Sequence, residues 1–230
     1  MSQLDKQSES QAESTSQQRT PRQQRSRERV EAILNAAKQL IEEKGSAGLK
    51  IQDIAARAGV TASSMYQYFP NKAAIIHALA QHYLDKVNEM LQMALQEKPQ
   101  TLEQCAQTLE FLFEQFHQLY CHDPVIRDIW VSTAADKNMQ NMDIEDSRRN
   151  AALLFEHFRD VFPEAHWQRL ERMLFLAMHL SGSTIRLALS VDQEEGHELI
   201  AIAKHIISSS LMSSLEKTLF EDGSSDACLS

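Results

Sequence analysis

The chain of 230 residues contains 43% hydrophobic and 24% charged residues, a composition that excludes a wholly disordered or fibrous protein. It contains only six glycines and five prolines, which favours an all-helical fold over a sandwich or barrel with its many turns. The three cysteines form no CxxC pair, and neither a signal peptide nor an apolar stretch of about 20 residues is present, so we expect a cytoplasmic protein with no membrane association.

The net charge of −9 conceals an uneven distribution along the chain. Residues 19–72 carry ten Lys and Arg against five Asp and Glu, a balance of +5, whereas residues 73–230 carry twelve against twenty-four, a balance of −12. A small basic part joined to a large acidic one is the asymmetry expected of a nucleic-acid-binding domain attached to a separate body.

Residues 1–24 are rich in Gln, Ser, Thr and Arg and lack the apolar side chains needed for a core, so we expect a disordered arm. Arg22, Arg25 and Arg27 have two interpretations: part of a solvated surface, or a strap that contacts phosphates or the minor groove of DNA. At the other end of the chain, residues 223–230 are polar and predict a flexible tail.

Apolar residues at helical spacing predict a first helix over Arg27–Lys44. Two short helices follow, over residues 51–58 and 61–69, and a fourth helix over 72–96 connects them to the rest of the chain. Two short helices joined by a tight turn need the flanking helices to complete a core, so residues 25–72 predict a three-helix helix-turn-helix DNA-binding domain.

The expected helix ends rest on residue types suited to them. Gly45 and Gly59 tolerate the left-handed backbone conformation that ends many helices. Thr61 and Asn71 are good N-caps, since their side chains accept hydrogen bonds from the first backbone N–H groups of a helix.

Residues 73–222 predict a larger, all-helical domain that ends shortly before the tail. Its helices are expected at a capping box beginning with Thr101, at Asp123-Pro124, at Asp143, over Trp167–Ser190 and over Glu194–Phe220.

The second short helix has the composition of an element that reads DNA. With Met65 and Phe69 facing inward, its outward surface offers hydrogen-bond donors and acceptors to bases and phosphates. The outward residues are Ser63, Ser64, Tyr66, Gln67 and Tyr68. Lys72, in the first turn of the next helix, opposes the helix dipole unless a phosphate binds there; the alternative is an ordinary solvated lysine.

The run Ile51-Gln-Asp-Ile-Ala-Ala-Arg-Ala-Gly-Val-Thr-Ala-Ser-Ser-Met-Tyr-Gln-Tyr-Phe-Pro-Asn-Lys72 resembles the signature of the TetR family of bacterial regulators. The similarity covers about residues 27–79 and includes the Asp-Ile-Ala, Ala-Gly-Val and Tyr-x-Tyr-Phe-x-Asn-Lys elements. Because these elements keep the family's order and spacing over more than twenty residues, the resemblance is specific.

The resemblance implies roles for particular residues. Gln52 and Ser64 stand where family members contact bases or nearby backbone, with Ser63 and Gln67 as further candidates. The phosphate-gripping positions of the family correspond to Tyr66, Tyr68 and Lys72. Lys50 departs from the pattern, because the family commonly has a capping threonine there; a lysine cannot cap, although its ammonium can still reach the DNA backbone.

The remainder of the chain resembles the family only in its expected architecture, an all-helical domain for ligand binding and dimerisation. By that resemblance the last two long helices pair with those of a second copy in a four-helix bundle, which makes the protein a homodimer. The small residues of Ser181–Thr184 would allow close helix approach in that bundle, and a packing site within one subunit explains them nearly as well.

Aromatic, methionine and histidine side chains of the larger domain are candidates for a ligand pocket, although most such residues are ordinary core. The candidates are Phe113, Phe116, His117, Tyr120, Trp130, Phe155, Phe158, Phe175, Met178 and His179. His117 and Cys121 are spaced to chelate a metal from one helix, but no third ligand is evident, so we expect no metal site. No catalytic triad, phosphate loop or carboxylate dyad stands out, and we expect neither an enzyme nor a cofactor.

These patterns predict a ligand-responsive, sequence-specific transcriptional regulator. We expect a bacterial homodimeric repressor, associated with the nucleoid when bound, that binds a palindromic operator in double-stranded DNA and is released by a small, largely apolar molecule. The alternatives are a helical ligand-binding or scaffold protein without operator binding, which would leave no footprint on genomic DNA, and an enzyme, which would turn over a bound compound.

Overall fold

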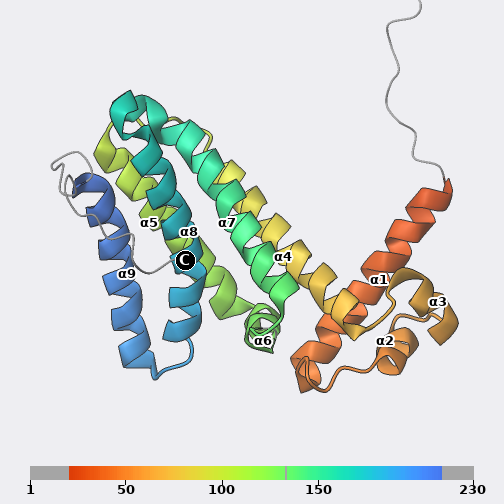
Figure 1. The fold of residues 1–230 in the computed structure, drawn as a ribbon. Coiled ribbons are helices and arrows are strands. Elements are labelled where there is room, and N and C mark those ends of the chain that lie inside the picture. The colour runs from red at the N-terminus through yellow and green to blue at the C-terminus, as the bar shows by residue number, and fades with distance from the viewer. Residues whose placement is uncertain (1–20, 133, 214–230) are drawn as a thin grey trace, which may run out of the picture.

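The computed structural model of the chain describes residues 21–132 and 134–213, and every regular element within them is helical. Three helices form a small unit at one end of the molecule, and one long helix joins this unit to a larger helical bundle (Figure 1). The predicted fold class, all-α with an N-terminal helix-turn-helix followed by a larger helical domain, is confirmed.

The small unit consists of three helices, and the connecting helix begins directly after it. Their bounds are α1 Pro21–Lys44, α2 Ile51–Arg57, α3 Ala62–Tyr68 and α4 Lys72–Ala94. Gly45 and Gly59 have φ angles of 75° and 66°, in the left-handed region predicted for these helix ends. Thr61 and Asn71 cap α3 and α4 as predicted, because their side-chain oxygens accept from Ser64 N at 3.2 Å and Ala74 N at 2.9 Å.

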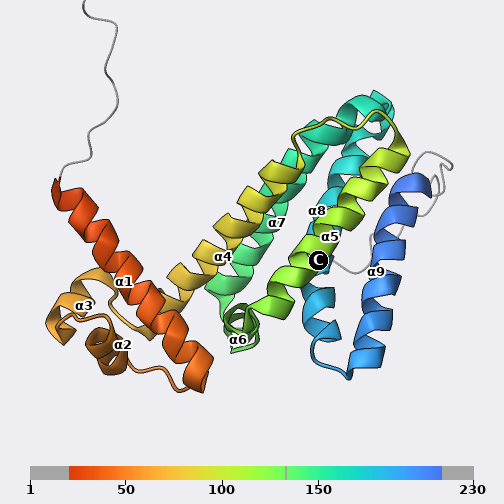
Figure 2. The ribbon, with the colours of Figure 1, turned by 180° about the vertical axis from the view of Figure 1, so that it is seen from behind.

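The larger bundle contains the other helices of the described residues. Their bounds are α5 Leu102–His122, α6 Pro124–Ser132, α7 Lys137–Phe158, the short 3₁₀ helices Arg159–Val161 and Glu164–His166, α8 Trp167–Ala188 and α9 Gln193–Ser213. Seen from behind, α4 and α7 lie on the side of the bundle nearest the small unit, and α9 lies farthest from it (Figure 2). The short α6 lies where the bundle meets the DNA-binding unit, in contact with α1, α4 and α5.

Two expected boundaries differ from the structure, and a third lies outside the described residues. Helix α1 begins at Pro21, so residues 21–24, which we assigned to the disordered arm, are helical; the rest of the arm lies outside the described residues. The prediction that Asp143 begins a helix is wrong, because α7 already begins at Lys137 and Asp136 caps it. Residues 214–220 of the predicted last helix, and the tail, also lie outside the described residues.

The error at Asp143 has a tertiary cause. Asp136 and Asp143 are both good N-caps by residue type, but the Asp136 Oδ1 atom accepts from the N–H groups of Asn138 and Met139. The helix can begin there because Met139, one turn before Asp143, is almost completely buried. Asp143 therefore lies inside the helix rather than at its start.

The buried side chains form two clusters. The first is continuous from the DNA-binding helices through α4 into α5, α6 and the adjoining ends of α8 and α9. The second occupies the opposite end of the bundle, between α5, α7 and α8. Since one core spans the junction of the two domains, a change of packing near α4 and α6 affects both of them.

Candidate nucleic-acid interface and ligand cavity

Helix α3 is held by its inner face and leaves its outer face free. Met65 is completely buried and Phe69 nearly so, which fixes the rotation of the helix against α1, α2 and α4. Ser63, Tyr66 and Gln67 are exposed, and 52% of Tyr66 is accessible. The outer face thus presents a hydroxyl, a phenol and an amide on a rigid support, as a helix that reads base edges requires.

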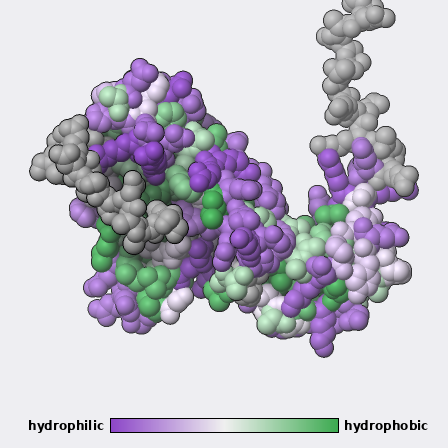
Figure 3. Space-filling view, in the orientation of Figure 1, coloured by the Kyte–Doolittle hydropathy of each residue, from purple (hydrophilic) through white to green (hydrophobic). Residues whose placement is uncertain are grey.

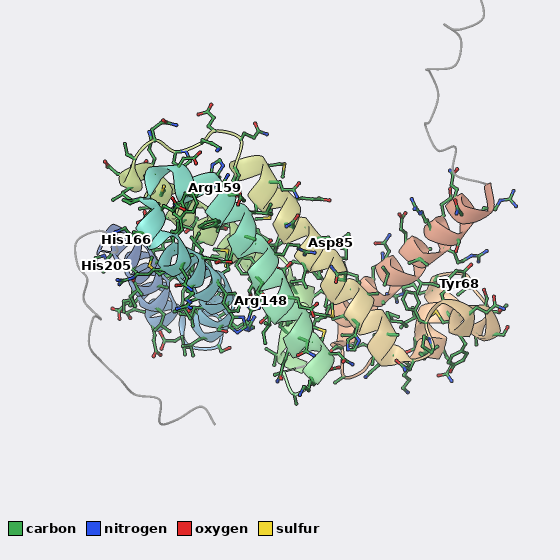
Figure 4. The ribbon with its side chains drawn as sticks, turned by 45° about the horizontal axis from the view of Figure 1, so that its top comes forward. Tyr68, Asp85, Arg148, Arg159, His166 and His205 are labelled. Atoms are coloured by element: carbon green, nitrogen blue, oxygen red, sulfur yellow. The ribbon has the colours of Figure 1, made fainter. Side chains whose placement is uncertain are left out.

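The remaining predicted residues of α3 are only partly accessible. Ser64 is half-buried, and its backbone N–H is engaged by the Thr61 cap. Tyr68 is half-buried and packs against the first core cluster (labelled in Figure 4). Tyr68 therefore stabilises the domain in addition to any contact with DNA.

Helix α2 lacks a side-chain cap at its first residue. Lys50 occupies the N-cap position with extended backbone angles, and its side chain makes no capping hydrogen bond. Lys50 and Gln52 are both exposed. Ion pairs between Lys44 and Asp53, and between Arg57 and Glu43, fix α2 to the end of α1 instead.

Lys72 has partners within the chain that the sequence did not suggest. Its Nζ atom donates to the backbone carbonyls of Ser46 and Ala47, at 3.2 and 3.3 Å. These carbonyls follow the end of α1, where backbone oxygens lack helical partners. Lys72 thus ties the start of α4 to the loop after α1, and it is not a fully solvated side chain.

The arginines of the predicted arm lie on the first turns of α1. Arg25 and Arg27 are exposed, and Arg22 is part of the helix although its side chain lies outside what the structure describes. These turns extend beyond the helix-turn-helix (Figure 1). The positive charges of Arg25 and Arg27 are therefore carried by a helix.

Polar contacts join the DNA-binding domain to the bundle. Asp123, between α5 and α6, accepts from Lys38 Nζ at 2.7 Å and from Tyr83 Oη at 2.8 Å. Asp128 of α6 accepts from the backbone N–H of Ser46 at 2.7 Å. Sequence reasoning identified Asp123 only as a cap of α6, a role it also has through Val125 N, because nothing local indicates a partner 85 residues earlier in the chain.

A cavity of about 60 Å³ lies inside the bundle, with room for a few water molecules; we call it the central cavity. Helices α4, α5, α6, α7 and α8 all contribute to its wall. The lining residues are Tyr83, Leu84, Val87, Met90, Leu91, Leu112, Phe113, Phe116, Tyr120, Ile126, Trp130, Asp143, Asp146, Ser147, Asn150, Met178, Ser181 and Gly182. Five predicted pocket residues are among them: Phe113, Phe116, Tyr120, Trp130 and Met178.

The other five predicted pocket residues lie elsewhere. Phe158 is fully buried in the second core cluster, against which Phe155 and Phe175 pack, and Arg148 lies over the Phe175 ring at 4.4 Å (Arg148 is labelled in Figure 4). His179 Nδ1 lies 3.3 Å from the Ser147 hydroxyl, outside the cavity lining. His117 Nε2 lies 3.3 Å from Cys121 Sγ, also away from the cavity.

Four cavity residues were not predicted because they are polar. Asp143, Asp146, Ser147 and Asn150 follow the i, i+3, i+4, i+7 spacing of one helical face, and we call them the polar row of α7. Burial raises the pKa of the Asp143 and Asp146 carboxyls above their ordinary values. The helical spacing of the four polar residues was the available signal, but a polar stripe on a helix normally faces solvent.

Three further observations concern metal binding, membrane spans and the small residues of α8. Among the residues that the structure describes, no group of three or more His, Cys, Asp and Glu side chains is arranged to hold a metal ion. None of the helices in the described ranges is long and apolar enough to span a bilayer. The small residues Ser181 and Gly182 face the central cavity within one subunit.

Comparison with protein families gives two matches. Residues 33–79 match the family described as "Bacterial regulatory proteins, tetR family". Residues 103–215 match the family described as "Tetracyclin repressor-like, C-terminal domain". The two matched segments correspond to the helix-turn-helix with the start of α4, and to the bundle from α5 onward.

Among curated proteins, the chain is similar to the HTH-type transcriptional regulator EthR. It is 34% identical over 89 residues to EthR of Mycolicibacterium smegmatis, covering 36% of this chain and 41% of that protein. The match to EthR of Mycobacterium tuberculosis is 38% identical over 65 residues and covers 28% of each chain. The chain thus spans less than half the length of these relatives.

Solved structures share the fold over most of the chain. A TetR-family regulator from Pectobacterium atrosepticum aligns with a TM-score of 0.61 at 18% identity, covering 86% of this chain and 99% of that one. The repressor AlkX from Dietzia gives 0.57 at 15% identity, with 80% and 95% covered. RolR in complex with resorcinol gives 0.57 at 16% identity, with 85% and 97% covered.

Proposed function

Because the chain belongs to the TetR family of bacterial regulatory proteins, we propose that it is a homodimeric repressor that binds a palindromic operator and is released by a small, largely apolar molecule. The outer face of α3 is the observation that carries the DNA-binding part. Ser63, Tyr66 and Gln67 project from a helix whose inner face is fixed by Met65. Gln52 of α2 and Lys50, directly before that helix, are exposed polar residues as well.

Sequence readout and phosphate contact are assigned to different residues in this proposal. Ser64 and Gln67 read base edges, with Ser63 and Gln52 beside them, since hydroxyl and amide groups match the donors and acceptors of the major groove. The phosphates of the DNA backbone are held by Tyr66, Tyr68, Lys50 and Lys72. Arg22, Arg25 and Arg27 add positive charge beyond the recognition helix.

The Gln67→Ala variant tests sequence readout. Genomic fragments that bind the purified protein are selected, and their affinity is compared with that of a random duplex at several salt concentrations. Gln67→Ala should lose about 1–3 kcal/mol of binding free energy on selected fragments and almost none on the random duplex. Gln115→Ala, an exposed glutamine of α5, is the matched control.

The Lys72→Ala variant separates phosphate contact from the intrachain role of Lys72. Affinity for every duplex should fall, and the dependence of affinity on salt should weaken by about one counterion. Its thermal unfolding must be measured alongside, because the bonds to Ser46 and Ala47 are also lost. If no genomic fragment binds selectively at low salt, a helical ligand-binding or scaffold protein without an operator is the better assignment.

A second copy is the proposed partner of an apolar face on α8 and α9. Large apolar side chains there are about half exposed in the single chain: Leu176 (56%), Leu180 (45%), Leu187 (52%), Ile202 (54%) and Ile206 (54%). Hydrophobic atoms gather on the surface over these helices (Figure 3). A contiguous apolar face of this kind is typical of an interface between subunits.

The oligomeric state in solution tests this face directly. Sedimentation equilibrium should give a dimer for the wild-type chain and a monomer for Leu180→Glu with Ile206→Glu. Met93→Glu, which changes an equally exposed apolar residue on α4, is the control and should remain dimeric. A monomeric wild-type protein would contradict the proposal, because one short recognition helix reads too few bases to specify a site.

Release by a ligand is proposed to act through α4 and α6. Both helices line the central cavity, through Val87 and Met90 on α4 and Ile126 and Trp130 on α6. Helix α4 begins next to α3, and Asp128 of α6 contacts Ser46 in the loop after α1. A ligand larger than the cavity of about 60 Å³ must displace these helices, which changes the spacing of the two recognition helices in a dimer.

A further inference from the structure

The wall of the central cavity carries two carboxylates and no basic side chain. Its 18 lining residues include Asp143 and Asp146 but no Lys, Arg or His. The rest of the wall is mainly aromatic and aliphatic, from Leu84 on α4 to Trp130 on α6. The charge available to a molecule inside is therefore negative, and it lies on one side only, along α7.

The hydroxyl hydrogens of the wall's serines are already used within the protein. Ser147 and Ser181 donate to the backbone carbonyls of Asp143 and Ala177, each at 2.7 Å. Tyr83 on the α4 side donates to Asp123. These three hydroxyls offer a bound molecule acceptor lone pairs rather than donors.

Asp146 and Asn150 are also engaged. Asp146 accepts from Arg149 and, at 2.8 Å, from Asn150 Nδ2, while Asn150 Oδ1 accepts from Asn88 Nδ2 at 2.9 Å. The Asp143 carboxylate, by contrast, accepts no hydrogen bond from any residue in the described ranges. Its oxygens are therefore available to accept from a bound molecule.

Three cations lie near the polar row of α7, and all of them belong to residues outside the lining of the cavity. His179 Nδ1 lies 3.8 Å from Asp143 Oδ2, and Arg149, with 47% of its side chain exposed, binds Asp146 from the solvent side. Arg186 donates to Ser183 Oγ at 3.1 Å, and its guanidinium lies 5.7 Å from the centre of the Trp130 ring. None of the three is among the lining residues, although Arg186 lies beside Tyr120 and Gly182, which are, and its charge partly offsets the rise that burial gives to the pKa of the Asp143 carboxyl.

We propose that the central cavity binds an apolar organic amine, whose ammonium group donates to the Asp143 carboxylate while its hydrocarbon or aromatic part lies among Phe113, Phe116 and Trp130. This inference rests on the proposed function and specifies the chemical class of its effector. Burial raises the pKa of the Asp143 carboxyl, and a cation that pairs with it inside the cavity relieves that unfavourable burial. The aromatic rings add attraction for a cation near their faces.

Three probes of nearly equal size test the class: phenethylamine, phenethyl alcohol and phenylacetate. Their dissociation constants for the full-length protein are measured by calorimetry. The amine should bind at least roughly tenfold more tightly than the carboxylate, since a hydrogen bond to a charged group contributes at least that factor. Longer phenylalkyl amines extend the series in case the first probe fills too little of the cavity.

The Asp143→Asn variant tests the assigned residue. It should weaken amine binding roughly tenfold and leave the alcohol nearly unchanged, because only the amine carries the charge that Asp143 neutralises. Asp85→Asn, the same change at an exposed position of α4 (labelled in Figure 4), is the matched control. The comparison of probes on the wild-type chain remains decisive if Asp143→Asn does not fold.

The outcomes separate this inference from the proposed function. Tighter binding of the carboxylate overturns the amine assignment in favour of an anion site, particularly if Arg186→Gln abolishes that binding. Failure of every amine in the series to bind also overturns the amine assignment. Amine binding that leaves DNA affinity unchanged supports the cavity assignment and contradicts the effector part of the proposed function. Release of DNA by anionic but not cationic probes supports the effector part of the proposed function and contradicts the amine assignment.

Discussion

At the scale of single residues, Asp123 links three parts of the molecule with one carboxylate. Its Oδ2 atom accepts from Lys38 of α1 and Tyr83 of α4, and its Oδ1 atom caps α6. Burial alone would raise the pKa of this carboxyl, but the hydrogen bonds from Lys38 and Tyr83 outweigh burial and hold the pKa below its ordinary value. Asp123 therefore stabilises the folded chain in its charged form.

The Asp123→Ala variant should lower the free energy of unfolding at neutral pH by about 1–3 kcal/mol, because the buried Tyr83 hydroxyl loses its acceptor. Since the folded-state pKa lies below the unfolded value of about 3.9, this stabilisation is present above that pH and is lost as the pH falls through the folded-state pKa. Denaturant unfolding measured from pH 7 to about pH 3 should show that the difference in unfolding free energy between the wild type and Asp123→Ala decreases as the pH falls.

Asp160→Ala is the control for this prediction. Asp160 pairs with Lys98 at 2.7 Å, but both side chains are more than half exposed, so its removal should leave the free energy of unfolding nearly unchanged. Equal effects of the two substitutions at neutral pH would show that burial of the Asp123 network adds nothing to stability.

At the scale of elements, α2 is the short helix with the weakest start. Lys50 has the extended backbone of an N-cap but no capping side chain, whereas Thr61 and Asn71 cap the next two helices. Lys50→Thr should stabilise the protein by about 1 kcal/mol, measured as a rise in melting temperature of roughly 2–4 °C. Lys50→Val has the shape of threonine without the hydroxyl, and it should not reproduce this gain.

The affinity of Lys50→Thr for DNA gives an independent result. Both substitutions remove the ammonium, so both should weaken binding to all duplexes alike if Lys50 contacts a phosphate. A variant that melts higher and binds DNA as the wild type does would leave Lys50 with no role at the interface.

Local sequence signals predicted the DNA-binding domain well because its elements are defined by near neighbours. The Gly59 turn, the Thr61 cap and the inward side of Met65 each depend on residues within a few positions, and the structure has all three as expected. The lone error in capping, at Asp143, arose where two equally good caps compete and distant packing of Met139 decides between them.

The central cavity was predictable only in part, for a physical reason. An aromatic residue at helical spacing faces the interior, but the pattern does not distinguish a wall with free volume from a filled core; Phe116 and Phe158 have the same local signature, and only Phe116 lines the cavity. The polar row of α7 has the pattern of a solvated face. Its position against α4, α5 and α8 is a property of the bundle and of no single helix.

At the scale of the whole molecule, one path of contacts leads from the central cavity to the DNA-binding helices. Trp130 and Ile126 line the cavity from α6, and Asp128 of the same helix accepts from Ser46 N at 2.7 Å. The Ser46 carbonyl in turn accepts from Lys72, at the start of α4 and next to α3. The backbone of Ser46 is thus held from both sides, by the bundle and by the DNA-binding domain.

We expect Asp128→Ala to uncouple the two domains without abolishing either binding activity. Four affinities complete a thermodynamic cycle: DNA with and without ligand, and ligand with and without DNA. In the wild type, DNA and the small molecule should each weaken the binding of the other by about 1–3 kcal/mol. In Asp128→Ala this coupling should fall toward zero, because movement of α6 no longer reaches Ser46, whereas the affinity for each ligand alone should stay within about threefold of the wild type.

The matched control for this cycle is Asp85→Ala, which removes an exposed carboxylate of α4 that accepts only from Gln81, one turn earlier. Its coupling should equal that of the wild type. If Asp128→Ala retained the full coupling, the signal would have to travel along α4, which both lines the cavity and begins beside the recognition helix, or through the contact of Asp123 with Lys38 of α1. The same four measurements on Lys72→Ala would then show whether the Ser46 carbonyl takes part, because that variant releases Ser46 from α4 and leaves its contact with Asp128 intact.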